Sequence, residues 1–303
     1  MSRLSLWFVG IAISFSINSM AQSPVPVDAL YLKNLDNFHR GMTRWKLKNF
    51  VPLVGLHILK EGDNTFGSGS GNDIVLNTQN APEVIGTITK KGSELTYTAF
   101  GELKPELDGN VVSRITYTFD DDHNSEKIRD KFITWYIQHV GDDYLLRIMD
   151  DENPLVRAYQ SQEYFPANDK YIFNARYKPY KNEEKIILSN VIDTWQEHKA
   201  TGDLIFKYKG KKYKLKVIGG YFVMFTDKTN GDTTFPLGRY VRIDTKDSKN
   251  IILDFNYSFS PPRSSSTYTT CDLPPVSNYL PFEILAGEKY DQTESEIIRP
   301  IHN

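Results

Sequence analysis

The stretch TTFPLGRYVRIDTKDSKNIILDFNYSFSPPRSSSTYTTCDLPPVSNYLPFEILAGEKY, Thr233–Tyr290, is the segment around which the chain is organised. Two runs rich in β-branched and aromatic residues, Arg239–Ile243 and Ile251–Phe255, flank a polar turn, and this pattern predicts two strands. A long loop rich in Pro, Ser and Thr follows the second run. Ordered loops of this length are usually functional or tightly hydrogen-bonded to the body of a domain. This block is therefore the first place to look for a site.

Several short strings in this block carry a family resemblance: GRY, LDFN, SPP, the C-x-L-P-P-x-x-N-x-L-P run of Cys271–Pro281, and AGEK. They closely resemble the C-terminal signature of the bacterial domain-of-unknown-function family 1684 (DUF1684). The resemblance continues upstream through Pro52–Leu76, Leu146–Tyr159 and Glu163–Pro179, so that it spans nearly all of the expected mature chain. It implies a fold and a set of shared residues, but no established activity.

The composition is that of a globular protein. With 303 residues, 40% of them hydrophobic, the chain can bury a core as one large domain or two modest ones without oligomerising. The net charge of −2 argues against a nucleic-acid partner, because phosphate neutralisation needs a clustered excess of Lys and Arg. The basic run Lys207–Lys216 is better explained as a charged hairpin whose lysines block edge pairing.

The N-terminus has the pattern of a secretory signal peptide over residues 1–21. Arg3 is followed by an apolar run to Ile17 and a small-residue site ending at Ala21, and that run is too short for a membrane span. We expect an exported protein, periplasmic or secreted, whose mature chain begins at Gln22. Its single cysteine, Cys271, has no intrachain partner and is more simply a buried thiol than a nucleophile.

The family resemblance adds one expectation about that cysteine. Members of the family often carry a second cysteine directly after the Pro-Pro pair of the same loop, where this chain has Arg263. The resemblance thus implies that a small loop staple has been lost here.

The remaining patterns predict an all-β protein with two β-sandwich-like lobes and an N-terminal amphipathic packing helix. The helix is expected over residues 28–47, with Asp28 as its N-cap. The first lobe is expected over 50–150 and the second over 154–290, with a frayed tail at 291–303. Strands are predicted at Val51–Leu59, Thr87–Phe100, Val111–Phe119, Lys131–His139, Tyr144–Met149, Tyr171–Tyr177, Lys185–Val191, Thr194–Ala200, Asp203–Tyr208, Lys211–Val217 and Phe222–Phe225.

The glycine-rich stretch Gly62–Leu76 resembles the turn of the forkhead-associated domain, with the pattern G-R-x-x-x-N-D-I-x-L. It leads into a strand, whereas nucleotide phosphate loops lead into a helix, so a nucleotide site is disfavoured. Ser68 occupies the Arg position of that pattern, and Ala81-Pro82-Glu83 offers no Ser-x-x-His. Because phosphate needs charge-assisted donors, the resemblance implies a degenerate sandwich without phosphothreonine binding.

The chemistry-bearing residues give no metal, cofactor or catalytic motif. The histidines lack metal-ligand spacing, the Asp120–Asn124 run lacks a calcium loop's Gly and Glu, and no nucleophile elbow is present. What remains is a polar cluster that either binds a ligand or supports the long loop: Arg239, Asp254, Asn256, Asn278 and Glu288. In the structural interpretation, the Arg239 guanidinium forms an ion pair with Asp254 or Glu288. The side-chain amides of the cluster then form hydrogen bonds with backbone groups of the loop.

Two function classes stay open. The first is a non-catalytic exported protein that binds a small molecule, a protein or a glycan. The second is a periplasmic hydrolase, possibly acting on a glycan, that uses carboxylates of the C-terminal block. A deep pocket holding two of Asp227, Asp254 and Glu288 with raised pKa values favours the enzyme. An Arg239 buried in an ion pair favours the binding protein.

Overall fold

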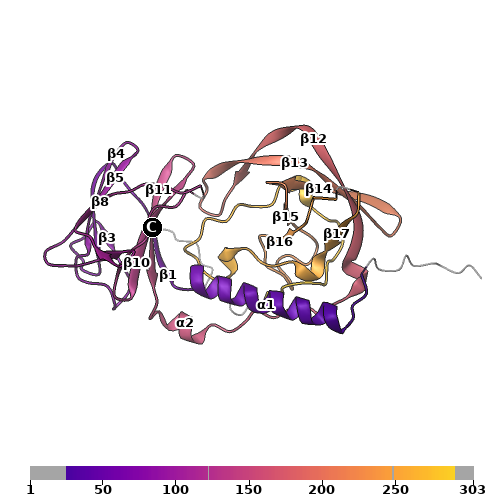
Figure 1. Cartoon of the computed structure of the whole chain (residues 1–303), viewed down its shortest axis with the longest axis horizontal. Helices are drawn as coiled ribbons and strands as arrows, with labels where there is room; N and C mark the ends of the chain where they lie inside the picture. The colour runs from indigo at the N-terminus through magenta and orange to yellow at the C-terminus, as the bar shows by residue number, and fades with distance from the viewer. Residues whose placement is uncertain (1–24, 122, 248, 291–303) are drawn as a thin grey trace, which may run out of the picture.

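The computed structural model describes residues 25–121, 123–247 and 249–290. Figure 1 shows two β lobes with one long helix lying along the second of them. The signal peptide predicted at 1–21 and the tail predicted at 291–303 lie outside the described residues. Within the described residues, no helix has the length and apolarity that a membrane crossing requires.

The long helix is α1, Ala29–Asn49. It begins at Asp28, whose carboxylate accepts a hydrogen bond from the Tyr31 backbone N–H at 2.8 Å and so caps the first turn. Its buried side chains include Leu35 and Met42, which pack into apolar clusters formed with strands of the second lobe. The N-terminal packing helix predicted from the apolar spacing is therefore confirmed.

The first lobe, residues 53–150, is a sandwich of two sheets. One has six strands in the order β1-β11-β10-β9-β6-β7, and the other has five in the order β3-β2-β4-β5-β8. Aromatic side chains of Phe66, Tyr97 and Trp135 meet edge-on or tilted between the sheets and are almost fully buried. The strands are β1 Leu53–Ile58, β2 Gly62–Gly67, β3 Ile74–Val75, β4 Gly86–Lys91, β5 Glu94–Ala99, β6 Glu106–Leu107, β7 Asn110–Val111, β8 Arg114–Thr116, β9 Ile128–Asp130, β10 Ile133–Val140 and β11 Asp143–Asp150.

The strand predicted over Val111–Phe119 is wrong in one respect, because it is two short strands in different sheets. Asp108 and Gly109 both have positive φ and turn the chain so that β7 pairs back onto β6. The chain then crosses to the opposite sheet, where β8 pairs with β5. An uninterrupted run of β-branched residues does not reveal such a change of sheet.

The second lobe is built on one six-stranded sheet in the order β16-β15-β14-β13-β12-β17. The all-β prediction is confirmed, but this sheet curves into a nearly closed barrel, and among the described residues no second sheet is stacked on it as in a sandwich. Its interior holds the largest apolar cluster, which includes Phe206, Phe225 and Phe255. The elements are α2 Pro154–Ala158, η1 Asp169–Tyr171, β12 Ile172–Ser189, β13 Trp195–Tyr208, β14 Lys211–Ile218, β15 Phe222–Phe225, β16 Arg239–Arg242 and β17 Ile251–Asp254.

Four predicted strands merge into two long ones, β12 and β13. The expected breaks near Pro179 and Gly202 are register shifts within a continuous ladder. A bulge of this kind bends a strand while its pairing continues, and bent strands are what a closing barrel needs. The charged hairpin predicted over Lys207–Lys216 is confirmed, with Lys209 and Gly210 at positive φ in its turn.

The lobes meet through a small apolar cluster. Leu53, Tyr136 and Met149 on the outer face of the six-stranded sheet of the first lobe pack with Phe50 and Tyr268. Tyr268 belongs to the C-terminal segment, residues 255–290, which carries the short turns η2 Phe255–Tyr257, η3 Pro262–Ser264 and η4 Val276–Asn278. The loop singled out from the sequence thus packs between the barrel and the first lobe.

Candidate functional site

Arg239 lies inside the second lobe, with a side chain that is 0% exposed. Its Nη2 forms an ion pair with Asp227 Oδ2 at 2.8 Å and donates to the Ile284 carbonyl oxygen at 2.8 Å. Its Nη1 donates to the Ala286 carbonyl oxygen, and the guanidinium carbon lies 5.3 Å from the centre of the Phe225 ring. Burial lowers the pKa of Arg239, and the charge of Asp227 opposes that shift. The guanidinium therefore ties the C-terminal segment to the barrel.

The predicted partner of Arg239 is wrong: its carboxylate partner is Asp227, and neither Asp254 nor Glu288 takes that place. The register explains the pairing, because Phe225 on β15 lies opposite Arg239 on β16, and Asp227 follows two residues later. Asp227 Oδ1 also accepts from the N–H and hydroxyl of Thr229 and from the Ile284 N–H. The ion pair and the turn after β15 are thus one hydrogen-bonded unit.

Glu288 pairs with Lys46, a residue that sequence reasoning missed. Their charged atoms are 2.5 Å apart, and the side chains are 1% and 0% exposed. Glu288 also acts electrostatically on Arg239. Lys46, Glu288, Arg239 and Asp227 therefore form what we call the charge chain, four buried charges of alternating sign. The sequence signal for Lys46 was its spacing, since it follows Leu35 and Met42 on the apolar face of α1.

Asp254 and Asn256 fix α1 and a neighbouring loop to the end of the barrel. The Tyr31 hydroxyl donates to Asp254 Oδ2 at 2.7 Å, and the Asn256 backbone and side-chain nitrogens each donate to Asp254 Oδ1 at 2.9 Å. Asn256 also exchanges two hydrogen bonds with the backbone of Asn168. Burial is the main cause that raises the pKa of Asp254. Both side chains have structural partners in this arrangement.

Asn278 satisfies backbone groups of two barrel strands. Its side-chain nitrogen donates to the carbonyl oxygens of Lys216 at 3.0 Å and Met224 at 2.8 Å, and its oxygen accepts from the Lys216 N–H at 2.7 Å. The structure thus divides the five predicted residues. Arg239 and Glu288 share the charge chain, Asp254 and Asn256 form a pair, and Asn278 acts separately.

Cys271 is a buried free thiol. Burial raises its pKa to about 11, which disfavours the nucleophilic thiolate. Its sulfur accepts a hydrogen bond from the Arg263 backbone N–H at 3.3 Å. Position 263, where the family resemblance implies a second cysteine, therefore lies directly beside it.

The turn that resembles a forkhead-associated loop is closed by its own hydrogen bonds. Ser68 Oγ donates to the Ala81 carbonyl oxygen at 2.9 Å, and Asn72 Nδ2 donates to the carbonyl oxygens of Gly69 and Glu83. The absence of phosphothreonine binding stays a prediction.

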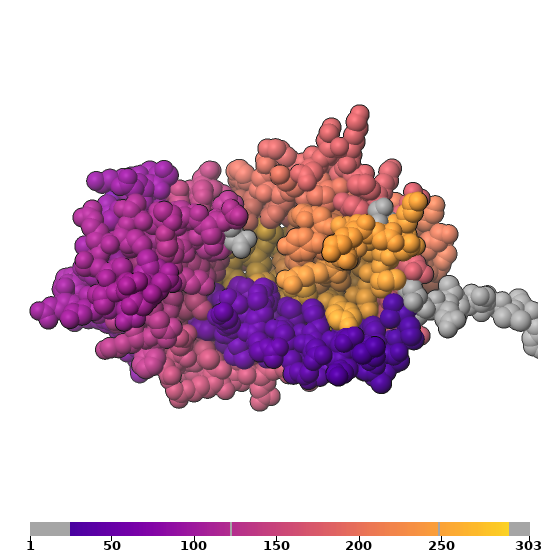
Figure 2. Space-filling model, viewed as in Figure 1, coloured from indigo at the N-terminus to yellow at the C-terminus, as the bar shows by residue number. Residues whose placement is uncertain are grey.

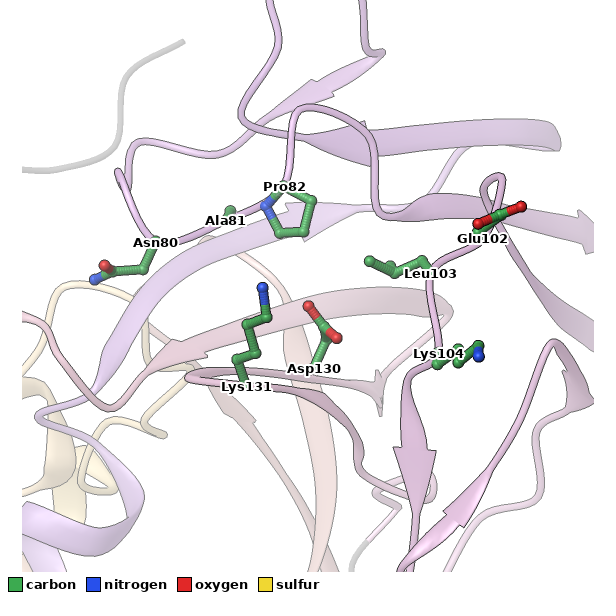
Figure 3. Close-up of a pocket in the computed structure, with 8 residues that line it drawn as sticks. All are labelled: Asn80, Ala81, Pro82, Glu102, Leu103, Lys104, Asp130 and Lys131. Carbon is green, nitrogen blue, oxygen red and sulfur yellow. The ribbon is translucent and has the colours of Figure 1, made fainter.

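An open cavity of about 530 Å³ lies in the first lobe, away from these residues. Figure 3 shows its lining: Asn80–Pro82 on one side, Glu102–Lys104 on another, and Asp130 with Lys131 below them. Its charged groups have both signs, and none of the five predicted site residues contributes to it.

Comparison with known proteins finds a family model and solved structures that are similar to parts of this chain. Residues 157–289 match the model of a family described as "Protein of unknown function (DUF1684)". Pro52–Leu76 and most of Leu146–Tyr159, to which the resemblance was expected to extend, lie outside this match. A solution NMR structure of an uncharacterised protein from Haloarcula marismortui is 29% identical, covers 46% of this chain and 81% of its own, and has a TM-score of 0.39. Among curated proteins, none matches.

Proposed function

We propose from the geometry that this protein is a non-catalytic binding or interaction protein. Residues 157–289 match the model of the DUF1684 family, whose description assigns no activity. The protein is exported through its N-terminal signal sequence to the periplasm or the medium, and its ligand is a small molecule, a protein or a glycan.

The partnering of the C-terminal carboxylates is the observation that supports this proposal. Asp227 is paired with Arg239, Glu288 with Lys46, and Asp254 accepts from Tyr31. Each of these carboxylates holds a structural partner through at least one oxygen, Glu288 through Oε1 alone, and that contact would have to break before the group could move to a substrate. These groups therefore act on the fold.

The alternative, a periplasmic hydrolase acting on a glycan, requires two of these carboxylates to face one another across a bound sugar. Asp227 and Glu288 are both fully buried, and each is neutralised by its own cation. The raised pKa of Asp254 is the one feature that a general acid would share, and its cause here is burial against α1.

A ligand screen followed by thermal unfolding tests the proposal. A compound or glycan that binds only the folded state raises the unfolding midpoint, and we expect such a compound to be recovered unchanged. Hydrolysis of a chromogenic glycoside or ester that is lost in Asp254→Asn, while that variant keeps its unfolding midpoint, would overturn the proposal. Intact-mass measurement of the exported protein tests export separately. The expected chain begins at Gln22, and a mass that still includes residues 1–21 argues against cleavage of a signal peptide.

A further inference from the structure

The open cavity of the first lobe is formed by three loops. Residues 80–82 lead into β4, residues 102–104 connect β5 to β6, and residues 130–131 end β9 and begin the turn to β10. Figure 2 shows the first lobe, in purple and magenta, projecting away from α1 and the barrel, and all eight lining residues belong to this lobe. The volume of about 530 Å³ lies within the range of about 300–1,000 Å³ that is usual for small-molecule sites. The cavity is therefore large enough for a small ligand.

Hydrogen bonds within the first lobe hold these loops in place. The Ala81 carbonyl oxygen accepts from Ser68 Oγ at 2.9 Å, and the Leu103 backbone N–H donates to the Phe100 carbonyl oxygen at 3.2 Å. The turn from β9 to β10 is closed by the antiparallel pairing of the two strands. Loops that are fixed in this way need little ordering when a ligand binds, which lowers the entropic cost of binding.

The turn between β9 and β10 directs two opposite charges into the cavity. Figure 3 shows the Lys131 ammonium and the Asp130 carboxylate both pointing toward Ala81 and Pro82 on the opposite wall. Lys131 has a φ of 51°, a conformation that tight hairpin turns usually assign to glycine or asparagine. The chain therefore holds a lysine at a position where the backbone alone favours glycine.

The protein itself does not neutralise either of these two charges. Within the part of the chain that the structure describes, neither side chain forms an ion pair or a hydrogen bond. The neighbouring Arg129 pairs with Asp151 at 2.7 Å. The nearby Asp150 carboxylate is 2% exposed and accepts from Asn80 Nδ2 at 2.9 Å, so it is already occupied. The ammonium and the carboxylate of the turn are therefore both available to a ligand.

The lining as a whole is electrically balanced. Glu102 and Lys104, both exposed, add one charge of each sign to those of Asp130 and Lys131. A ligand with a single charge would meet as much repulsion as attraction from such a lining, whereas a molecule that carries both charges can pair with one group of each sign. The charge pattern thus favours a zwitterion over a simple anion or cation.

The remaining lining residues provide an apolar wall. Figure 3 shows the Leu103 side chain pointing toward the space between Pro82 and Asp130, and Ala81 lies next to Pro82 on the same wall. Apolar walls with a few polar groups that fix orientation are usual in small-molecule sites. An apolar side chain on the zwitterion would therefore be removed from water by contact with Leu103 and Pro82.

We propose that this cavity binds a zwitterion with an apolar side chain, either a free α-amino acid or a short peptide with both termini free. The Lys131 ammonium binds the ligand carboxylate, the Asp130 carboxylate binds the ligand ammonium, and Leu103 with Pro82 contacts the side chain. This inference deepens the proposed binding function and rests on it, because it names the ligand class and the site.

The test is calorimetric titration of the protein with leucine and with leucyl-leucine at neutral pH and constant ionic strength. Two charge-assisted hydrogen bonds at an open site give an expected dissociation constant on the order of 1 mM. N-acetylleucine lacks the ammonium and leucinamide lacks the carboxylate, so each should bind roughly fivefold more weakly, the effect of one charge pair at contact in water. Glycine, which lacks the apolar side chain, should also bind more weakly than leucine. These comparisons use the wild-type chain and do not depend on how a variant folds.

Two variants assign the binding to the cavity. Asp130→Asn keeps the shape of the side chain, and Lys131→Gly suits the positive φ, so both should unfold at the wild-type midpoint. Each should weaken leucine binding roughly fivefold. Lys209→Gly is the matched control, because Lys209 is exposed and has a φ of 46° in the hairpin turn between β13 and β14, in the other lobe. This control should bind leucine like the wild type.

Tighter binding of leucine supports a free amino acid as the ligand, and tighter binding of leucyl-leucine supports a peptide. The inference is overturned if neither probe binds, or if N-acetylleucine, leucinamide or glycine binds as tightly as leucine. It is also overturned if Asp130→Asn and Lys131→Gly leave the affinity unchanged, or if Lys209→Gly weakens it equally. Should these zwitterions fail while the ligand screen finds another compound, the proposed binding function stands and this inference alone falls. Substrate turnover in that screen would count against the proposed function itself.

Discussion

Replacing Arg239 with alanine tests whether the C-terminal block supports the fold. In the variant, Asp227 stays buried without its cation, and the carbonyl oxygens of Ile284 and Ala286 lose their donors. Removing one partner of a buried ion pair costs about 3–5 kcal/mol. Asp227 Oδ1 keeps its hydrogen bonds from Thr229, which limits the loss on that side. The carbonyl oxygens of Ile284 and Ala286, left without donors, add to the loss of stability by roughly 1–3 kcal/mol each.

The assay is thermal unfolding monitored by circular dichroism, with urea unfolding to obtain the free energy. A loss of about 3–5 kcal/mol lowers the midpoint by on the order of 10 °C in a chain of this size. Arg242→Ala is the matched control, because Arg242 is exposed on the same strand and lies 5.7 Å from the Phe259 ring centre. Its loss should cost less than about 1 kcal/mol.

A double variant separates the stranded charge from lost packing. Arg239→Met combined with Asp227→Asn removes both charges while keeping comparable volumes, and it should recover most of the stability that Arg239→Ala loses. The reasoning is refuted if Arg239→Ala unfolds at the wild-type midpoint, or if Arg239→Ala and Arg242→Ala are indistinguishable. In either case Arg239 would be free to serve a ligand.

Three further predictions concern the same block. Lys46→Met should lower the free energy of unfolding in urea by about 3–5 kcal/mol, because Glu288 stays buried without its cation. Adding Glu288→Gln should restore most of that free energy. Equal stability of the wild type and the Lys46→Met variant contradicts the prediction. Because burial raises the pKa of Asp254, the folded state binds that proton more tightly than the unfolded state does. The free energy of unfolding should therefore fall as the pH rises from the ordinary carboxyl pKa to the raised one. Asp254→Asn should remove this pH dependence, and an unchanged dependence in the variant counts against the prediction. Arg263→Cys should form a disulfide with Cys271 on mild oxidation, which a mass measurement and a free-thiol assay would detect. Closing so short a loop stabilises the folded state by about 2–3 kcal/mol, from which the loss of the Arg263 side-chain contact must be subtracted. Free thiols that persist after oxidation refute the prediction.

Local patterns in the sequence were sufficient for the parts of the fold that depend on local chemistry. The spacing of Leu35 and Met42 predicted α1, and Asp28 its cap. The basic run Lys207–Lys216 predicted a charged hairpin, and in the structure its turn has Lys209 and Gly210 at positive φ. Strand continuity was harder, since Pro179 and Gly202 read as breaks in the sequence and act as bulges in the barrel.

The site residues could be selected from the sequence, but their partners could not. Arg239 and Glu288 stood out because charges inside an apolar block need partners. Lys46 is separated from Glu288 by 242 positions, and Arg147 from Thr270 by 123. No local signal encodes such pairings, because they depend on how α1 and the first lobe dock against the C-terminal segment.

The two kinds of buried arginine point to different roles. Arg239 is neutralised by Asp227 inside a chain of alternating charges, so a bound anion would compete with a partner that is already in place. Arg147, on β11 of the first lobe and 4% exposed, is held by neutral acceptors of both lobes, namely Gln138 on β10 and Tyr268 and Thr270 of the C-terminal segment. The same residue type therefore ties the C-terminal segment to the barrel where a carboxylate pairs with it, and to the first lobe where its acceptors are neutral.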